Sequence, residues 1–69
     1  MRIYKLSLCF SEWTHDTEVK ATYYKDRPTR GQLMLDGMGS DACDVVLQYG
    51  AVQDSSPGYV WKLGIIEVK

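Results

Sequence analysis

Histidine, cysteine and proline are scarce in this sequence, and it has no long hydrophobic run. Its 69 residues include one histidine, two cysteines and two prolines. A membrane-spanning helix needs about 20 apolar residues, and polar residues interrupt the N-terminal run MRIYKLSLCF, which also lacks a signal-peptide cleavage site. Secreted domains that depend on disulfides are richer in cysteine. We therefore expect a cytoplasmic protein in which Cys9 and Cys43 are free thiols; a bridge between them stays open as the alternative.

The same scarcity argues against a metal site and against catalysis. Zinc sites usually need about four ligands at fixed spacing, and no CxxC, HxxxH or HExxH pattern occurs. Cys9 lies in an alternating strand pattern, and Cys43 is flanked by two acids, which disfavour a reactive thiolate. The sequence therefore predicts no catalytic residue, no metal and no cofactor, and we expect a protein that is not an enzyme.

Charge of either sign is not in excess. Eight Lys and Arg residues against nine Asp and Glu residues leave a formal charge of −1. Strong non-specific binding to nucleic acid, which depends on neutralising phosphates, is therefore not expected. A chain of this size forms a single domain, residues 1–69, and buries only about 60% of the surface of its unfolded chain. Little room is left for a deep substrate cleft.

Two segments in the first third of the chain alternate between apolar and polar residues. The alternation runs through Ile3–Phe10 and resumes in Glu18–Tyr24, and it is typical of strands with one buried face. A short polar segment joins them, so we expect an antiparallel hairpin. In the second strand, Glu18 and Lys20 are expected to share a face.

A short helix is predicted after this hairpin. Thr29 and Gln32 fit a capping box, in which a hydroxyl and an amide each satisfy a free backbone donor. Apolar residues follow at helical spacing, although Leu35 falls off the apolar stripe. Gly37 offers a C-terminal stop, and a cap at Ser40 or Asp41 would split the helix into two pieces.

The last third of the chain predicts two further strands. Val45–Val52 is mostly apolar and includes three β-branched valines, as in a strand buried on both faces. Tyr59–Val68 alternates again, with Gly64 expected to mark a β-bulge. We predict an α+β fold: a small antiparallel sheet of about four strands with one short helix, in the order ββαββ.

The connection Ser11–Glu18, SEWTHDTE, is a candidate contact surface. It holds Trp13 and the only histidine, His15, among acidic residues. Tryptophan is enriched at the energetic centres of protein interfaces, so Trp13 is a candidate partner-binding residue. The alternative is that Trp13 packs as the last core residue of the first strand.

Charged residues are distributed unevenly along the chain. Between Gly31 and Trp61 there is no Lys or Arg, and we expect the aspartates there to form an acidic patch that binds a partner, since local stability does not explain a carboxylate late in a helix. The partner-binding candidates in this stretch are Asp36, Asp41, Asp44 and Asp54. A second candidate surface combines basic and aromatic residues, which together hold single-stranded nucleic acid in some proteins. Its members are Lys20, Tyr24, Lys25, Arg27 and Arg30.

In length, predicted layout and the acid-only stretch Gly31–Trp61, the chain resembles small phage-encoded inhibitors, the class that contains anti-CRISPR proteins and inhibitors of host polymerases. The resemblance spans the whole chain and includes no sequence motif. It implies a compact domain that blocks the surface of a larger host complex without catalysis, in the host cytoplasm. The net charge of −1 departs from the strongly acidic mimics of DNA.

Two functions therefore stand from the sequence. The first is a non-catalytic protein-binding module that inhibits or regulates a larger protein or protein–nucleic acid complex. The alternative is a small nucleic-acid-binding accessory protein that uses the Lys20–Arg30 segment. A second copy of the chain is a further partner, which we expect to pair along a sheet edge such as Ile3–Phe10 or Tyr59–Val68.

Overall fold

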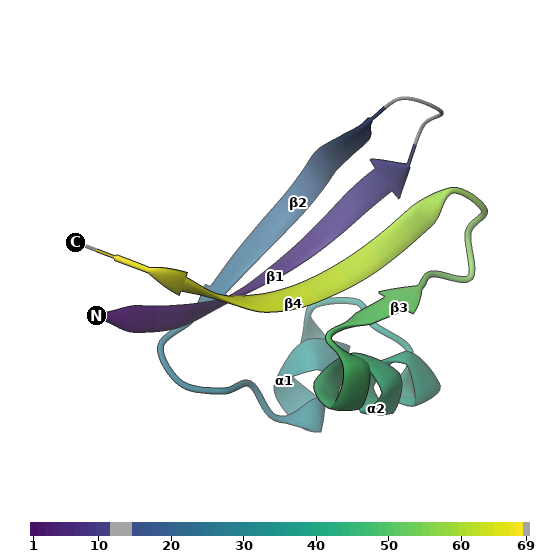
Figure 1. Cartoon of the computed structure of the whole chain (residues 1–69). Coiled ribbons are helices and arrows are strands. Elements are labelled where there is room, and N and C mark those ends of the chain that lie inside the picture. Colours follow the sequence, from purple (N-terminus) through teal and green to yellow (C-terminus); the bar gives the residue numbers. More distant parts are fainter. Residues whose placement is uncertain (12–14, 69) are drawn as a thin grey trace.

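The computed structural model describes residues 1–11 and 15–68, which form a four-stranded antiparallel sheet and two helices (Figure 1). The α+β class predicted from the sequence is confirmed. The elements in chain order are β1 Arg2–Ser11, β2 Asp16–Tyr24, α1 Arg30–Leu35, α2 Ser40–Tyr49, β3 Ala51–Gln53 and β4 Tyr59–Glu67.

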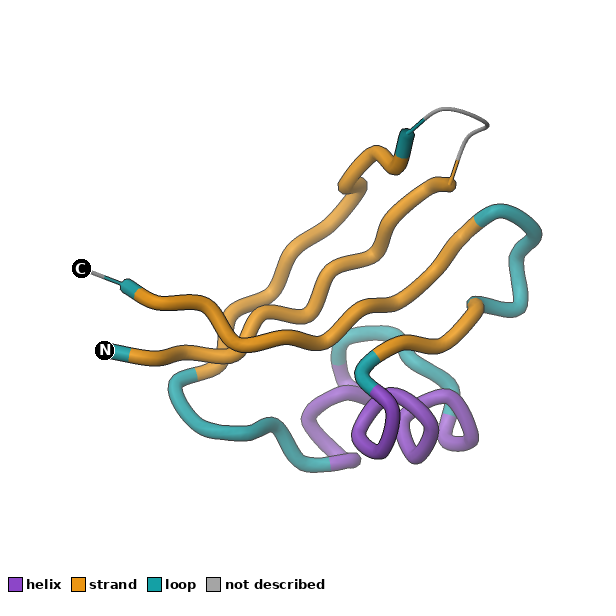
Figure 2. Tube along the Cα trace, in the orientation of Figure 1, coloured by secondary structure: helices purple, strands orange, loops and turns teal. Residues whose placement is uncertain are grey.

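The strands lie in the order β2-β1-β4-β3, so β1 and β4 are interior strands. Both helices lie on the same side of the sheet (Figure 2). The expectation that Ile3–Phe10 forms a sheet edge is wrong, because β1 pairs with β2 on one side and with β4 on the other. The strand predicted as Tyr59–Val68 is β4, and among the described residues β3 pairs with it at Val60–Lys62 alone.

The core lies between the sheet and the helices. Leu6 of β1 and Trp61 of β4 pack against Leu33 of α1 and against Cys43 and Val46 of α2. Leu6, Leu33, Cys43 and Val46 are almost completely buried. A few large side chains therefore provide most of the apolar burial that stabilises a domain of this size.

The prediction of a buried strand over Val45–Val52 is wrong. Residues up to Tyr49 belong to α2, and only Ala51–Gln53 form a strand. Gly50 separates the two with a left-handed backbone (φ 84°), which glycine adopts without steric cost. A short apolar run is ambiguous between a strand and a buried helix, and here helical spacing decides, since Cys43 and Val46 lie on the same face of α2.

The capping box predicted for the first helix is confirmed. The backbone N–H of Gln32 donates to the Thr29 hydroxyl at 3.2 Å, and the N–H of Thr29 donates to the Gln32 side chain at 2.8 Å. The helix ends after Leu35, and Gly37 has a positive φ of 103°. A second helix then begins at Ser40, so the alternative of a helix in two pieces is the one found, although its N-cap is Gly39 and not Ser40 or Asp41.

The β-bulge lies in the hairpin and not at Gly64. The register of β1 with β4 is continuous from Arg2 to Phe10, whereas the register with β2 shifts between Leu8 and Cys9. Leu8 is paired with Lys20 and Cys9 with Glu18. Glu18 and Lys20 therefore lie on different faces of the sheet, against the prediction that they share one.

The sheet face without helices carries a row of ion pairs. Lys5 contacts Glu18 at 2.8 Å, and Lys62 contacts Asp16 at 2.8 Å. These pairs raise the pKa of both lysines and lower the pKa of both carboxylates. The bulge makes this row possible, because it brings Glu18 to the same face as Lys5.

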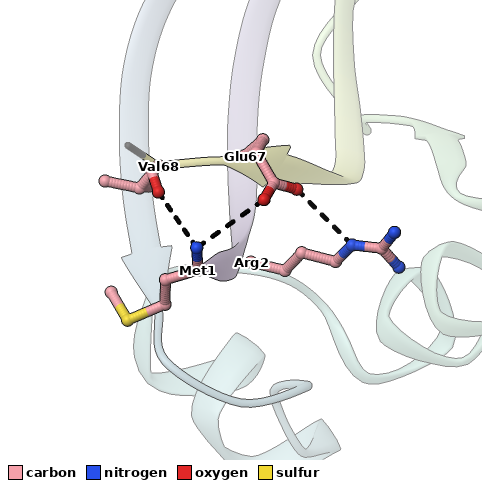
Figure 3. Close-up of polar contacts among 4 residues, drawn as sticks. All are labelled: Met1, Arg2, Glu67 and Val68. Atoms are coloured by element: carbon pink, nitrogen blue, oxygen red, sulfur yellow. Dashed lines mark hydrogen bonds and ion pairs between the residues drawn. The ribbon is translucent and has the colours of Figure 1, made fainter.

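The two ends of the described chain meet at one end of the sheet (Figure 3). The Met1 amino group donates to the Val68 carbonyl at 3.0 Å and lies 3.6 Å from the Glu67 carboxylate. Arg2 contacts the same carboxylate at 3.5 Å. These exposed ion pairs each contribute at most about 1 kcal/mol, but they keep the ends of β1 and β4 in register.

Candidate functional site

Trp13 lies outside the described residues, so the prediction of a contact residue at that position stays a prediction. The histidine of the same segment, His15, is exposed just before β2. Asp16 begins β2 and contacts Lys62. The end of the connection is therefore held against β4.

Asp36 is held by residues of the predicted basic segment. It is the C-cap of α1, and the Tyr24 hydroxyl donates to its carboxylate. The Lys20 ammonium donates to its backbone carbonyl at 3.1 Å. A carboxylate at a helix C-terminus is unfavourable by itself, but these two donors offset the cost. The inference that local stability does not explain Asp36 is therefore wrong.

Asp44 and Arg30 form a second contact between the two predicted surfaces. The Arg30 Nε lies 3.3 Å from Asp44 Oδ1, and the pair joins the first turn of α1 to the middle of α2. Arg27 donates to the carbonyl of Leu47 near the end of α2, where a cation is favoured by the helix dipole. Four of the five residues predicted to bind nucleic acid thus make contacts inside the molecule, and only Lys25 is exposed without a polar contact that the structure records.

Asp54 also has a local role, in the loop between β3 and β4. Its carboxylate accepts from the indole Nε1 of the core residue Trp61 at 3.0 Å and from the backbone N–H of Ser56 at 3.3 Å. The hydrogen bond from Trp61, with the Ser56 amide, lowers the pKa of Asp54. Asp54 is therefore a structural residue that keeps a buried donor satisfied.

Asp41, like Asp44, is exposed, whereas Asp36 and Asp54 are half-buried. It is exposed in the first turn of α2, where a negative charge is favoured by the helix dipole. The N-cap of this helix, Gly39, makes no side-chain cap. Of the predicted acidic patch, Asp41 and Asp44 are thus the members whose side chains are exposed on the helix layer.

The outer side of the helix layer combines these two aspartates with exposed apolar residues. Leu35 is 89% exposed and Tyr49 is 74% exposed, with Met34 at 47% and Val45 at 37%. Asp41, Val45 and Tyr49 are spaced four residues apart and so form one row along α2. We call the following residues the helix-layer surface: Met34, Leu35, Asp41, Asp44, Val45 and Tyr49.

Sequence reasoning found only part of this surface. Asp41 and Asp44 were expected to bind a partner, and Leu35 stood out because it falls off the apolar stripe of its helix. Val45 and Tyr49 were missed because their segment was interpreted as a strand. On a helix, Val45 falls opposite the buried residues Cys43 and Val46. Tyr49, three residues after Val46, falls at the border of the buried face.

Neither cysteine is arranged for nucleophilic chemistry. Both are free thiols, as expected from the sequence. Cys43 is completely buried under the sheet, and this burial raises the pKa of its thiol, with a smaller contribution from Asp44. Cys9 is buried in β1, where it packs as a small apolar residue. A buried thiol with a raised pKa is a poor nucleophile near neutral pH.

No cluster of three His, Cys, Asp or Glu side chains that could bind a metal is found among residues 1–11 and 15–68. In the same part of the chain, no helix is long and apolar enough to span a membrane. Comparison of the sequence and the fold with protein families, curated proteins and solved structures finds no match.

Proposed function

We propose that this chain is a non-catalytic protein-binding module, which occupies a surface of a larger protein or protein–nucleic acid complex in the cytoplasm and thereby inhibits or regulates it. The helix-layer surface carries the proposal. Its four apolar side chains and its two aspartates are exposed on the same two helices. Exposed apolar groups with a polar rim are typical of protein interaction sites.

The chemistry of this surface defines the partner. Leu35 and Tyr49 offer the largest exposed apolar area, and Tyr is enriched among residues that dominate binding energy. Asp41 favours Lys and Arg around the apolar contact, whereas Asp44 is already paired with Arg30. The partner is then a protein with an apolar depression inside a basic surface, a combination found where proteins handle nucleic acids. This agrees with the resemblance to small phage-encoded inhibitors.

The contacts within the basic segment favour this function over direct binding of nucleic acid. Lys20 and Arg30 are engaged with Asp36 and Asp44, and Arg27 contacts the end of α2. A phosphate would have to compete with these contacts. Release of few counterions gives weak binding with a shallow dependence on salt.

The test is recovery of a partner from cells of the native host with the tagged protein. We expect a protein at stoichiometric yield whose recovery survives nuclease treatment. The double variant Asp41→Lys/Asp44→Lys should slow association and flatten its dependence on salt. The matched control is Asp26→Lys, which changes an exposed carboxylate between β2 and α1, outside both candidate contact surfaces. Recovery that depends on nucleic acid, or equal loss in the control, would contradict the proposal.

A further inference from the structure

The outer edge of β4 is open at its C-terminal end. In the described residues, β3 pairs with β4 only at Val60–Lys62, and the Leu63 N–H donates to the Gly50 carbonyl at 2.8 Å. Backbone groups along an antiparallel strand point alternately to its two neighbours. The backbone N–H of Leu63 points away from β1. The backbone N–H and C=O groups of Ile65 and Glu67, two and four residues later, therefore point outward as well. Four strong hydrogen-bonding groups therefore line an edge that β3 does not cover.

Apolar groups lie along the same edge. The Ile65 side chain is 56% exposed, and Val68 is 36% exposed. A groove of about 340 Å³ adjoins the edge. It is lined by Tyr4, Arg27, Val46, Leu47, Gly50, Leu63, Gly64 and Ile65, of which only Arg27 is charged. The edge thus offers backbone hydrogen bonds, apolar area and one cation.

We propose that a second copy of this chain pairs with this edge, β4 against β4, in an antiparallel arrangement about a twofold axis at Ile66. Such an interface is isologous and closed, so it produces a dimer and no filament. The pairing joins two four-stranded sheets into one. It does not depend on the helix-layer surface, with which it shares no residue.

Of the axes at Ile65, Ile66 and Glu67, the one at Ile66 fits the free backbone groups best. An axis at Ile65 would bring the second Glu67 against Leu63, where Gly50 already lies. An axis at Glu67 would place the two Glu67 carboxylates directly across from each other, which is destabilising. An axis at Ile66 pairs Ile65 with the second Glu67 in both directions and so uses all four free backbone groups.

This register also matches the side chains. The two Ile66 residues come to lie in a non-hydrogen-bonded position, where cross-strand side chains are closest and β-branched pairs are favourable. Gly64 lies across from the second Val68, and a Cβ at Gly64 would meet nothing within 4 Å, so space is available there. Glu67 of the second copy lies across from Ile65, on the side of the groove that contains Arg27.

The test is sedimentation equilibrium of the whole protein over a concentration series. An interface this short is weak, so we expect a dimer that dissociates on dilution and is populated at about 1 mM. Amide exchange at Ile65 and Glu67 should slow as concentration rises, because these amides become bonded only in the dimer. A protein that stays monomeric at about 1 mM would overturn the proposal.

Charge variants at the axis test the register. Ile66→Glu and Ile66→Lys each place like charges across the axis, and each should weaken the dimer by about tenfold or more. An equimolar mixture of the two should recover it as a heterodimer, which only an axis at Ile66 allows. Because Ile66 is partly buried, Ile65→Pro is a second variant; it removes an outward N–H and leaves the bonds to β1 intact.

The control is Val19→Glu, on the edge strand at the other side of the sheet. It should leave dimerisation unchanged. A dimer that is abolished by Val19→Glu, or one that resists both Ile65→Pro and the Ile66 charge variants, would show that β4 does not form the interface.

Discussion

The helix layer has two apolar sides, and the fold uses only one of them. On the inner side, Leu33 and Val46 are completely buried against the sheet. On the outer side, Leu35 and Tyr49 belong to the same two helices and are among the most exposed large side chains. The inner residues stabilise the domain, whereas the outer ones bury little of their area on folding. Apolar area that folding leaves unused is what a binding surface needs.

The largest loss of stability is expected from a truncation on the inner side of the helix layer. Leu33→Ala should lower the free energy of unfolding by about 2–5 kcal/mol, because it leaves a cavity among packed core residues. Leu35→Ala, two residues later in the chain, should change it by no more than about 0.5 kcal/mol. Urea unfolding of both variants measures the difference, and equal losses would contradict the assignment of sides.

A smaller difference is expected between two aspartates that were predicted to act together. Asp54→Ala leaves the Trp61 indole without its acceptor and should lower the free energy of unfolding by about 1–3 kcal/mol. Asp41→Ala removes a charge from the first turn of α2 and should cost about 0.3–1 kcal/mol. Equal effects in thermal unfolding would show that Asp54 does not support Trp61.

The pH dependence of stability follows from the same contact. The folded-state pKa of Asp54 is lowered, so its contribution is fully present above its unfolded pKa, about 3.9. That contribution disappears as pH falls through the lower, folded pKa. The Asp54→Asn variant should therefore lose less stability than the wild type when the buffer is changed from pH 5 to pH 2, about the range in which carboxylates titrate. Parallel losses would contradict the prediction.

Cys43 distinguishes the inner side chemically. Because burial raises the pKa of its thiol, iodoacetamide should modify it slowly in the folded protein and rapidly in denaturant.

The variants Cys43→Ser, Cys9→Ser and His15→Ala, where they fold, should keep biological activity within a few-fold. A loss of orders of magnitude in a folded variant would show that the protein is a catalyst.

The smallest effect is expected for nucleic acid. At physiological salt, labelled single-stranded and duplex DNA and RNA should bind more weakly than about 1 μM, as in ordinary non-specific binding. Variants at Lys25 should change this little. A dissociation constant below this value would favour the basic segment over the helix-layer surface.

The sequence predicted those features that depend on local pattern. The alternation in β1 and β4 and the capping box at Thr29 each lie within a few residues, and all were found. The helix over Ser40–Tyr49 was not, because consecutive apolar and β-branched residues favour a strand as much as a buried helix. The bulge beside Glu18 was not predicted either, because the alternation of apolar and polar residues before it is regular.

The candidate site was harder to predict, since its charges are paired by tertiary contacts. Arg30 meets Asp44, and Tyr24 meets Asp36, only because the hairpin and the helices pack together. From the sequence alone, these residues were interpreted as members of two separate surfaces, one acidic and one basic. The exposed side of α2 also became recognisable only when Tyr49 was placed on a helix.

The most direct test of the central claim compares partner recovery with stability in the double variant Leu35→Ser/Tyr49→Ser. Val19→Ser, at a residue that is 56% exposed on β2, is its control. We predict that both proteins unfold cooperatively within a few degrees of the wild type, a shift of under about 1 kcal/mol, and that only the double variant loses the partner recovered from the native host. Full recovery with the folded double variant would contradict the claim that the outer side of the helix layer binds the partner.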